Sequence, residues 1–259
     1  MDNYHVCRIA VAPLRKEPAD RSEIVSQLLF GDRVKVLEKT EKWCFVITHY
    51  DNYEGWMDYK QLQKITDLQF ADEQAYQYLT PTQLDNTVIA PNGTKYYLSA
   101  GSTLPYFNNG SCFIGDNEFK VTSLPFIPNK ADFKVRVEET AKFFLNSPYL
   151  WGGRTFFGID CSGFVQMVFK LNGIQINRDA SQQAEQGEIV DFLASAELGD
   201  LAFFDNEEGK ITHVGLMLSN EQIIHSAGMV RIDPIDDQGI FNAELGKYTH
   251  KLRIIKRFV

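Results

Sequence analysis

The chain has 259 residues, of which 44% are apolar and 23% charged, and its formal net charge is −8. These values are ordinary for a globular protein, and an acidic chain without a basic cluster is not expected to bind nucleic acid. No apolar run approaches the roughly 18 residues that a membrane-spanning helix needs. The first residues also lack the apolar stretch of a signal peptide, which predicts a cytoplasmic protein, or an exported one if a signal sequence precedes them.

Four cysteines are spread thinly along the chain. None has the Cys-x-x-Cys spacing of a zinc site or a redox pair, and four are too few for a disulfide scaffold in a chain of this length. Cys7, Cys44 and Cys112 stand in apolar or strand-like surroundings. They are predicted to be small buried side chains, with one oxidised pair as the alternative.

Residues 1–65 are predicted to form an all-β domain. Short apolar or alternating runs lie at 6–11, 24–29, 33–38, 43–47 and 54–57. Short strands at this spacing, separated by turn residues, indicate a small barrel. A Leu-Phe-Gly-Asp turn, a Lys-Trp-x-x-Val strand and a Gly-Trp strand follow in an order that resembles a bacterial SH3-type domain.

Residues 66–129 are predicted to form a second, divergent SH3-like β domain. Strand-like runs lie at 87–90, 96–98, 104–107 and 118–121, and Asn-Gly turns at 92–93 and 109–110 separate them. A helix or an irregular connector is expected over 68–78. The aromatic pairs at 96–97 and 106–107 either line a groove for a sugar or peptide or belong to the core and the ordinary surface.

The third segment, 130–259, contains a cysteine next to a helix. Apolar residues at 164, 165, 168 and 171 have helical spacing. Cys161 would lie at the N-terminus of that helix, where free backbone N–H groups and the helix dipole favour an anion. That position lowers a thiol pKa and makes the nucleophilic thiolate more available. The alternative is a buried structural cysteine.

Two histidines follow in strand-like runs. His213 comes 52 residues after Cys161, and His225 comes 12 residues later, with Ser-Asn-Glu as the turn between their strands. A nucleophile needs a base within hydrogen-bond reach, and the base needs a third group that orients it. Cys161, His213 and His225 are predicted to fill these three roles. Helices before a run of strands indicate an α+β domain.

Six motifs of this segment occur in an order that resembles the NlpC/P60 family of bacterial cell-wall cysteine peptidases. They are Tyr-x-Trp-Gly-Gly at 149–153, Asp-Cys-Ser-Gly at 160–163, Arg-Asp-Ala-x-Gln at 178–182, Gly-Asp-Leu at 199–201, His-Val-Gly at 213–215 and Ile-His-Ser at 224–226. The resemblance implies a papain-like α+β catalytic domain, preceded here by one or two small SH3-like β-barrels.

The resemblance also implies roles for further residues. The Tyr149 hydroxyl and the Cys161 backbone N–H would stabilise the oxyanion, and Asp160 would bind a cationic amine of the substrate. The other residues expected at the substrate are Ser162, Trp151, Asp179 and Ser181, with Glu54 or Tyr59 supplied by the front domain. Helix capping is the alternative role of Asp160 and of Asp179.

Family members with SH3-type domains imply a substrate class. They cleave the bond between γ-D-glutamate and a diamino acid in peptidoglycan stem peptides. The expected substrate is a free muropeptide, L-Ala-γ-D-Glu with diaminopimelate or lysine and an unblocked amine, and the expected process is cell-wall recycling without a metal or other cofactor. The alternatives are an exported hydrolase of polymeric wall, another acyl-transfer enzyme, and a non-catalytic binding protein. The preferred diamino acid and the oligomeric state are not predicted.

Overall fold

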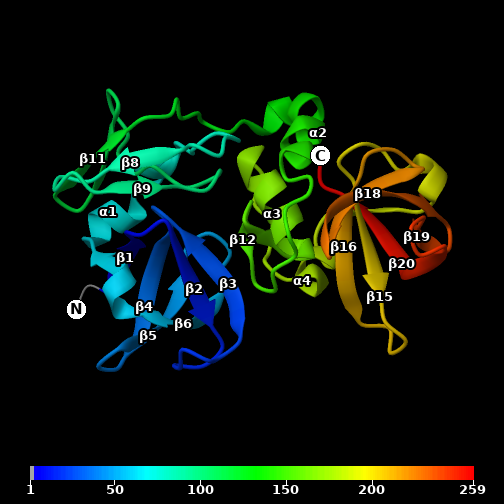
Figure 1. Cartoon of the computed structure of the whole chain (residues 1–259), viewed down its shortest axis with the longest axis horizontal. Coiled ribbons are helices and arrows are strands. Elements are labelled where there is room, and N and C mark those ends of the chain that lie inside the picture. The colour runs from blue at the N-terminus through cyan, green and yellow to red at the C-terminus, as the bar shows by residue number, and fades with distance from the viewer. Residues whose placement is uncertain (1–2) are drawn as a thin grey trace. The chain divides into compact units, whose positions relative to one another are not determined.

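A computed structural model describes residues 3–259 (Figure 1). The chain forms two compact units, and the boundary between them in the sequence lies between Pro128 and Asn129. Among the described residues, no helix is both long enough and apolar enough to cross a membrane. The first unit consists mainly of strands, and the second has helices followed by a large sheet. The predicted α+β class and the SH3-like β fold in front are confirmed.

The first unit is built around an antiparallel sheet of order β3-β2-β6-β5-β4-β1-β7. Its core is made of alternate strand residues, among them Leu14, Val36, Val46 and Met57. The run at 6–11 was predicted as one strand, but the structure breaks it between β1 and β2. The strands are β1 (Tyr4–Cys7), β2 (Val11–Arg15), β3 (Ile24–Leu29), β4 (Arg33–Lys39), β5 (Trp43–Thr48), β6 (Glu54–Asp58) and β7 (Leu62–Lys64), and a 3₁₀ turn, η1 (Tyr59–Gln61), precedes β7.

A second sheet of the same unit has the order β10-β11-β8-β9. Val6 and Phe30 of the first sheet region share one hydrophobic core with Val88 and Phe119 of the second. One continuous hydrophobic core therefore contains residues from both sides of the predicted domain boundary at residue 65. The elements are α1 (Asp67–Ala71), η2 (Glu73–Tyr76), β8 (Thr87–Ile89), β9 (Lys95–Tyr97), β10 (Ser111–Ile114) and β11 (Asn117–Val121).

The strand predicted at 104–107 was wrong. This segment is a turn, and Tyr106 has a positive φ of 52°, which a strand does not allow. The Leu104 side chain is buried in the shared core, so its apolar character reflects packing. Tyr96 and Phe107 also pack against this core, whereas Tyr97 is largely exposed. The aromatic pairs therefore divide between core and surface.

The second unit places its helices before a sheet of order β14-β20-β15-β16-β17-β18-β19. Because β19 also pairs with β20, six of these strands close into a barrel. The strands β18 and β19 were not predicted. The strands are β12 (Arg154–Thr155), β13 (Gly158–Ile159), β14 (Glu188–Val190), β15 (Leu201–Asp205), β16 (Ile211–Met217), β17 (Gln222–Ala227), β18 (Met229–Asp236), β19 (Gly239–Asn242) and β20 (Lys247–Arg257).

The helix α3 (Cys161–Leu171) is the centre of this unit. All of its residues are buried, as expected of a helix that is apolar around most of its circumference. It packs on one side against α2 (Phe133–Phe143), where the rings of Phe133 and Phe169 are 5.1 Å apart, and on the other side against β16. The arrangement is visible in Figure 1. The shorter elements are η3 (Lys130–Asp132), α4 (Ala180–Ala184) and η4 (Leu193–Ser195).

Candidate active site

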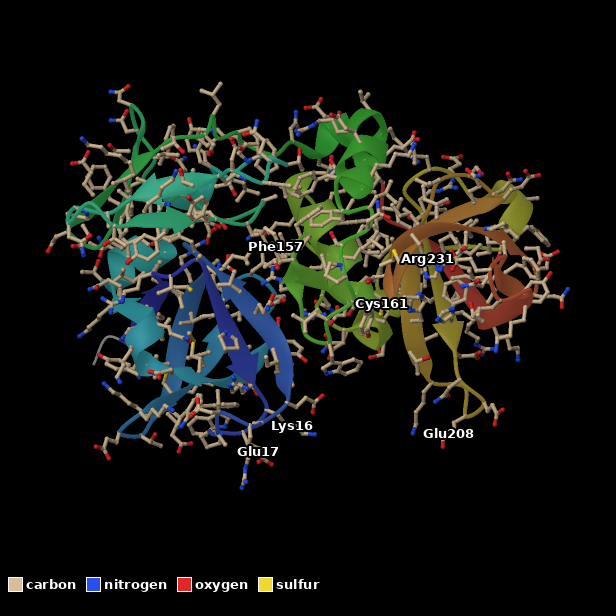
Figure 2. All side chains as sticks on the ribbon, viewed as in Figure 1. Lys16, Glu17, Phe157, Cys161, Glu208 and Arg231 are labelled. Carbon is tan, nitrogen blue, oxygen red and sulfur yellow. The ribbon has the colours of Figure 1, made fainter. Side chains whose placement is uncertain are left out.

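Cys161 is the first residue of α3 (Figure 2). The helix begins here because the Asp160 carboxylate caps it, accepting a hydrogen bond from the Gly163 N–H at 2.7 Å. Gly163 is required at this point, since a Cβ there would lie 2.3 Å from the Gly153 carbonyl oxygen. The predicted helix-terminal position of the cysteine is confirmed.

The expected low thiol pKa was wrong. Burial raises the pKa of the Cys161 thiol to about 12, and the neighbouring Asp160 carboxylate acts in the same direction. The Val214 and Ser162 N–H groups and the Arg178 guanidinium oppose this rise without reversing it. The helix N-terminus therefore acts in the predicted direction, but the cost of an anion inside the protein is larger. The resting group is a thiol, which needs a base.

His213, the predicted base, is next in sequence to Val214, whose backbone contacts the thiol. The Val214 N–H on β16 donates a hydrogen bond to the Cys161 sulfur. The His213 Nε2 atom lies 2.9 Å from His225 Nδ1 on the adjacent strand β17. This contact leaves His213 Nδ1 for the thiol proton. The structure thus places His213 and His225 in contact and the residue after His213 against the Cys161 thiol.

A third imidazole, not predicted, belongs to the same cluster. The His250 ring stacks on the His213 ring with 4.0 Å between centroids and 25° between planes. Burial, His250 and His225 together lower the pKa of His213 well below its usual value. Burial also lowers the pKa of His250 to about 4. Both rings are therefore neutral near neutral pH, as a general base must be.

The pH dependence of kcat/KM tests this cluster. His213 accepts a proton only in its neutral form, and its pKa is lowered, so activity should persist below pH 6.5 and decline as the pH falls through that lowered pKa. In His250→Phe, an apolar ring replaces the imidazole that lowers the pKa of His213. The pH below which kcat/KM declines should therefore be higher in this variant. A wild-type decline above pH 6.5, or no shift in the variant, would contradict this assignment.

The Asp160 side chain, predicted to bind the substrate amine, also makes hydrogen bonds inside the protein. Besides Gly163, it accepts hydrogen bonds from the Gly152 N–H at 2.8 Å and from Arg178 Nη1 and Nη2 at 3.0 and 2.6 Å. A carboxylate has about four acceptor sites, and these contacts use them. The capping alternative applies, with a buried ion pair added.

Arg178→Met should destabilise the fold strongly. Arg178 and Asp160 are both buried, and removal of one partner leaves an uncompensated charge inside the protein. The free energy of unfolding should fall by about 3–5 kcal/mol, measured by denaturant titration. Lys142→Met is the matched control, because Lys142 makes an exposed pair with Glu138, and its effect should stay within about 0.5 kcal/mol. Equal effects of the two variants would refute this role of the pair.

Tyr149 lies close to the nucleophile. Burial raises the pKa of its hydroxyl to about 12, and the nearby Cys161 and Asp160 add to the rise, so it remains a hydrogen-bond donor at neutral pH. This placement fits the predicted oxyanion role. Trp151 is 60% exposed. The Ser162 hydroxyl, in contrast, accepts a hydrogen bond from Arg178 at 2.8 Å within the buried network.

The remaining predicted binding residues are placed by the elements that carry them. Asp179 precedes α4 as its N-cap residue and its N–H donates to Gln182 Oε1 at 3.3 Å, while Ser181 is exposed on the helix. Glu54 and Tyr59 belong to the first unit, where Glu54 begins β6 and Tyr59 follows its end.

The three clustered histidines could also be considered as metal ligands. One ring nitrogen from each of His213, His225 and His250 lies within 4.8 Å of the others. Their geometry is poor for a cage, because two of the nitrogens share a hydrogen bond and the His213 and His250 rings are stacked. Lone pairs lie in the ring planes, so stacked rings do not direct them at one ion. The arrangement favours proton transfer.

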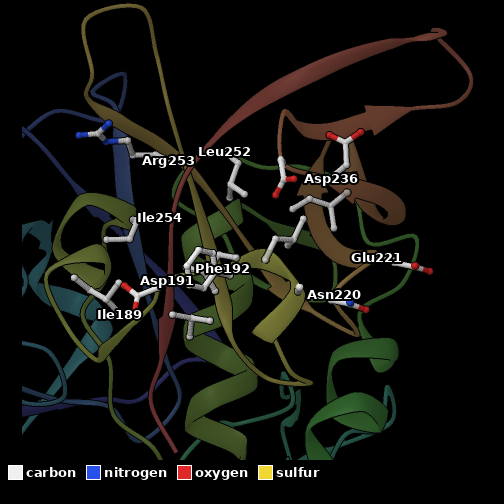
Figure 3. A pocket seen from close by; sticks show the side chains of 15 residues that line it. Ile189, Asp191, Phe192, Asn220, Glu221, Asp236, Leu252, Arg253 and Ile254 are labelled. Atoms are coloured by element: carbon white, nitrogen blue, oxygen red, sulfur yellow. The ribbon is translucent and has the colours of Figure 1, made fainter.

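A separate pocket of about 600 Å³ lies on the second unit between β14, η4, β18 and β20 (Figure 3). Its apolar wall includes Phe192, Leu252 and Ile254, and acidic side chains such as Glu221 and Asp236 stand at its rim. None of the predicted site residues lines it. The chemistry therefore belongs to the cluster around Cys161.

Sequence reasoning missed Arg178, His250 and Asp233. Arg178 was noted as part of a motif without a role, and only its burial against Asp160 shows one. His250 comes 25 residues after His225 and carries no local signal. Asp233 accepts a hydrogen bond from His225 Nε2 at 2.9 Å. The alternation of polar and apolar residues at 229–236 could have indicated its strand.

A buried thiol at a helix start, an imidazole base and an orienting imidazole define a cysteine peptidase site. Residues 146–247 match the NlpC/P60 family model, and residues 14–62 match the bacterial dipeptidyl-peptidase SH3 domain. The chain belongs to the NlpC/P60 family and is a cysteine peptidase.

Two curated relatives carry the same name, gamma-D-glutamyl-L-lysine dipeptidyl-peptidase. The protein from Bacillus subtilis is 34% identical over 78% of this chain and 72% of its own length. The one from Bacillus cereus is 28% identical over 87% of this chain and 74% of its own length. These matches extend well beyond the catalytic unit.

Solved structures share the fold along nearly the whole chain. An NlpC/P60 family protein from Bacillus cereus superposes with a TM-score of 0.79 at 22% identity, covering 98% of this chain and 99% of that one. An NlpC/P60 endopeptidase from Photobacterium damselae gives 0.73 at 18% identity, covering 98% and 70%. At these identities the likeness concerns the fold alone.

Proposed function

We propose that the chain hydrolyses the bond between γ-D-glutamate and the diamino acid of peptidoglycan stem peptides. The observation that carries the proposal is the buried Cys161 thiol in contact with the N–H of Val214, the residue after His213, whose ring is hydrogen-bonded to His225. The bond follows from the two relatives named gamma-D-glutamyl-L-lysine dipeptidyl-peptidase, whose similarity includes the front unit. Lysine in that name makes L-lysine one diamino acid to test, beside diaminopimelate.

The reaction uses one proton carrier. His213 Nδ1 takes the Cys161 proton while the sulfur attacks the γ-carbonyl of D-glutamate. The oxyanion of the tetrahedral intermediate accepts hydrogen bonds from the Cys161 N–H, which has no intrahelical partner, and from the Tyr149 hydroxyl. His213 then protonates the leaving amine and a thioester remains. Water, deprotonated by His213, hydrolyses the thioester and restores the thiol.

The proposed substrate is a free peptide with an unblocked L-Ala amine, cleaved during cell-wall recycling in the cytoplasm. The front SH3-type domain supports a free peptide as substrate. It matches the SH3 domain of bacterial dipeptidyl-peptidases, and the relative from Bacillus subtilis is named a dipeptidyl-peptidase. The front domain would then decide which N-termini are accepted.

The test uses L-Ala-γ-D-Glu-L-Lys, its diaminopimelate counterpart and the N-acetylated form of each, with products identified by mass. Cleavage of the free peptides only, absent in Cys161→Ala, would support the proposal. Equal cleavage of acetylated peptides would refute recognition of the amine, and release of peptides from intact sacculi would favour an exported wall hydrolase. No cleavage of any peptide would refute the substrate assignment.

A further inference from the structure

The hydrogen-bonded chain of the active site continues beyond His225. The second ring nitrogen of His225, Nε2, lies 2.9 Å from Asp233 Oδ2. Asp233 is on β18, antiparallel to β17, and both side chains are almost fully buried. A buried carboxylate at this distance from an imidazole forms a short, directed contact shielded from water.

Asp233 is held in place by a second contact. Arg231 Nε donates to Asp233 Oδ2 at 2.7 Å and Arg231 Nη2 donates to Oδ1 at 3.0 Å, so the guanidinium binds both oxygens. Arg231 Nη1 also reaches Glu244 Oε2 at 3.1 Å. Burial alone would raise the pKa of Asp233, but the hydrogen bonds from His225 and Arg231 lower it. Asp233 is therefore an ionised acceptor near neutral pH.

An acceptor at this place determines which nitrogen of each neutral histidine carries the proton. A carboxylate only accepts hydrogen bonds, so His225 Nε2 must carry a proton. His225 Nδ1 then has a lone pair and accepts from His213 Nε2, which must also be protonated. His213 Nδ1 is left with a lone pair, which is the form that can take the thiol proton.

We propose that Asp233, clamped by Arg231, is a positioning residue that sets the tautomers of both His225 and His213. The proposal rests on the proposed roles of Cys161 and His213. When the sulfur attacks, only the thiol proton moves. It passes to His213 Nδ1, and the resulting imidazolium keeps its Nε2–H bonded to His225, while Asp233 stays ionised.

Histidine tautomers can be measured without substrate. The nitrogen spectrum of protein labelled with ¹⁵N-histidine distinguishes protonated Nδ1 from protonated Nε2, and His→Gln variants assign the five rings. Both His213 and His225 should be in the Nε2–H form at neutral pH. A wild-type spectrum with His225 protonated at Nδ1 would overturn the proposal, whatever any variant does.

Asp233→Asn is the matching substitution. Because Arg231 donates to both carboxylate oxygens, an amide at this position must place its NH₂ group against either a guanidinium donor or His225. The preference of His225 for the Nε2–H tautomer should weaken, because a neutral amide accepts less strongly than a carboxylate and one of its two orientations presents a donor to the ring. We expect kcat to fall about 10- to 100-fold with KM changed less than threefold, the size typical when a partner one step from the reacting groups is removed.

Asp236→Asn is the control, because Asp236 lies on the same strand but is exposed and bonds to Tyr248 instead of a histidine. It should leave the histidine spectrum and kcat unchanged. In a His225→Ala background, Asp233→Asn should change kcat less than twofold, since no ring remains to transmit its effect. A full loss in that background would overturn the proposal in favour of a structural role.

These outcomes separate the two proposals. If the unmodified chain cleaves no peptide, the proposed function fails, and the histidine spectrum still tests the tautomer assignment. If the chain is active and Asp233→Asn leaves both the spectrum and kcat unchanged, the tautomer assignment fails while the function stands.

Discussion

Replacing Cys161 with alanine should lower kcat about 10⁴- to 10⁶-fold, the loss typical when a catalytic nucleophile is removed. The sulfur of Cys161 is the atom that forms the thioester intermediate. Without it, His213 has no thiol to deprotonate and Tyr149 has no oxyanion to stabilise. Binding should persist, because the truncation removes only the sulfur. Turnover of the peptide substrate and its dissociation constant, measured by calorimetry, give the two readouts.

Cys112→Ala is the matched control for this substitution. Cys112 is equally buried, and burial raises the pKa of its thiol to about 12, but it belongs to the core of the first unit. We expect a small loss of stability and no change in kcat. Activity retained by Cys161→Ala, or lost in Cys112→Ala with the fold intact, would contradict the assignment of the nucleophile.

His213→Gln should reduce kcat/KM by about 10⁴-fold near pH 8 and should also change the shape of the pH profile. Without a base, the reaction depends on spontaneous thiolate, and a thiol with a pKa of about 12 supplies about one part in 10⁴ of it at that pH. Activity of the variant should therefore rise about tenfold per pH unit between pH 7 and 10. The wild type should be flat over the same range.

His250→Phe serves as the control, since it keeps an aromatic ring on His213 but carries no titratable group. Its kcat at pH 8 should stay within about threefold of the wild type, and its profile above pH 7 should be flat. A flat profile for His213→Gln would mean that another group accepts the thiol proton, and His213 would then not be the base.

Much of the site could be predicted from local sequence because its chemistry depends on short motifs. Cys161 and the residues on either side of it identify a helix start, and the spacing of His213 and His225 places them on adjacent strands. The strand predicted at 104–107 failed because an apolar residue pattern does not distinguish a strand from a buried turn. β18 was missed although its residues alternate, and its Asp233 is buried against His225.

The sequence by itself determined the class of the protein and the α+β order of its elements, and it predicted the nucleophile and the base, since each depends on residues close together in the chain or on a motif. Only the tertiary structure decided how these groups behave. Burial turned the expected thiolate at Cys161 into a thiol, and Arg178 engaged the carboxylate of Asp160 that was expected to bind substrate. Asp233 reached His225 through strand pairing. Desolvation and long-range hydrogen bonds set these properties, and both depend on neighbours that are distant in sequence.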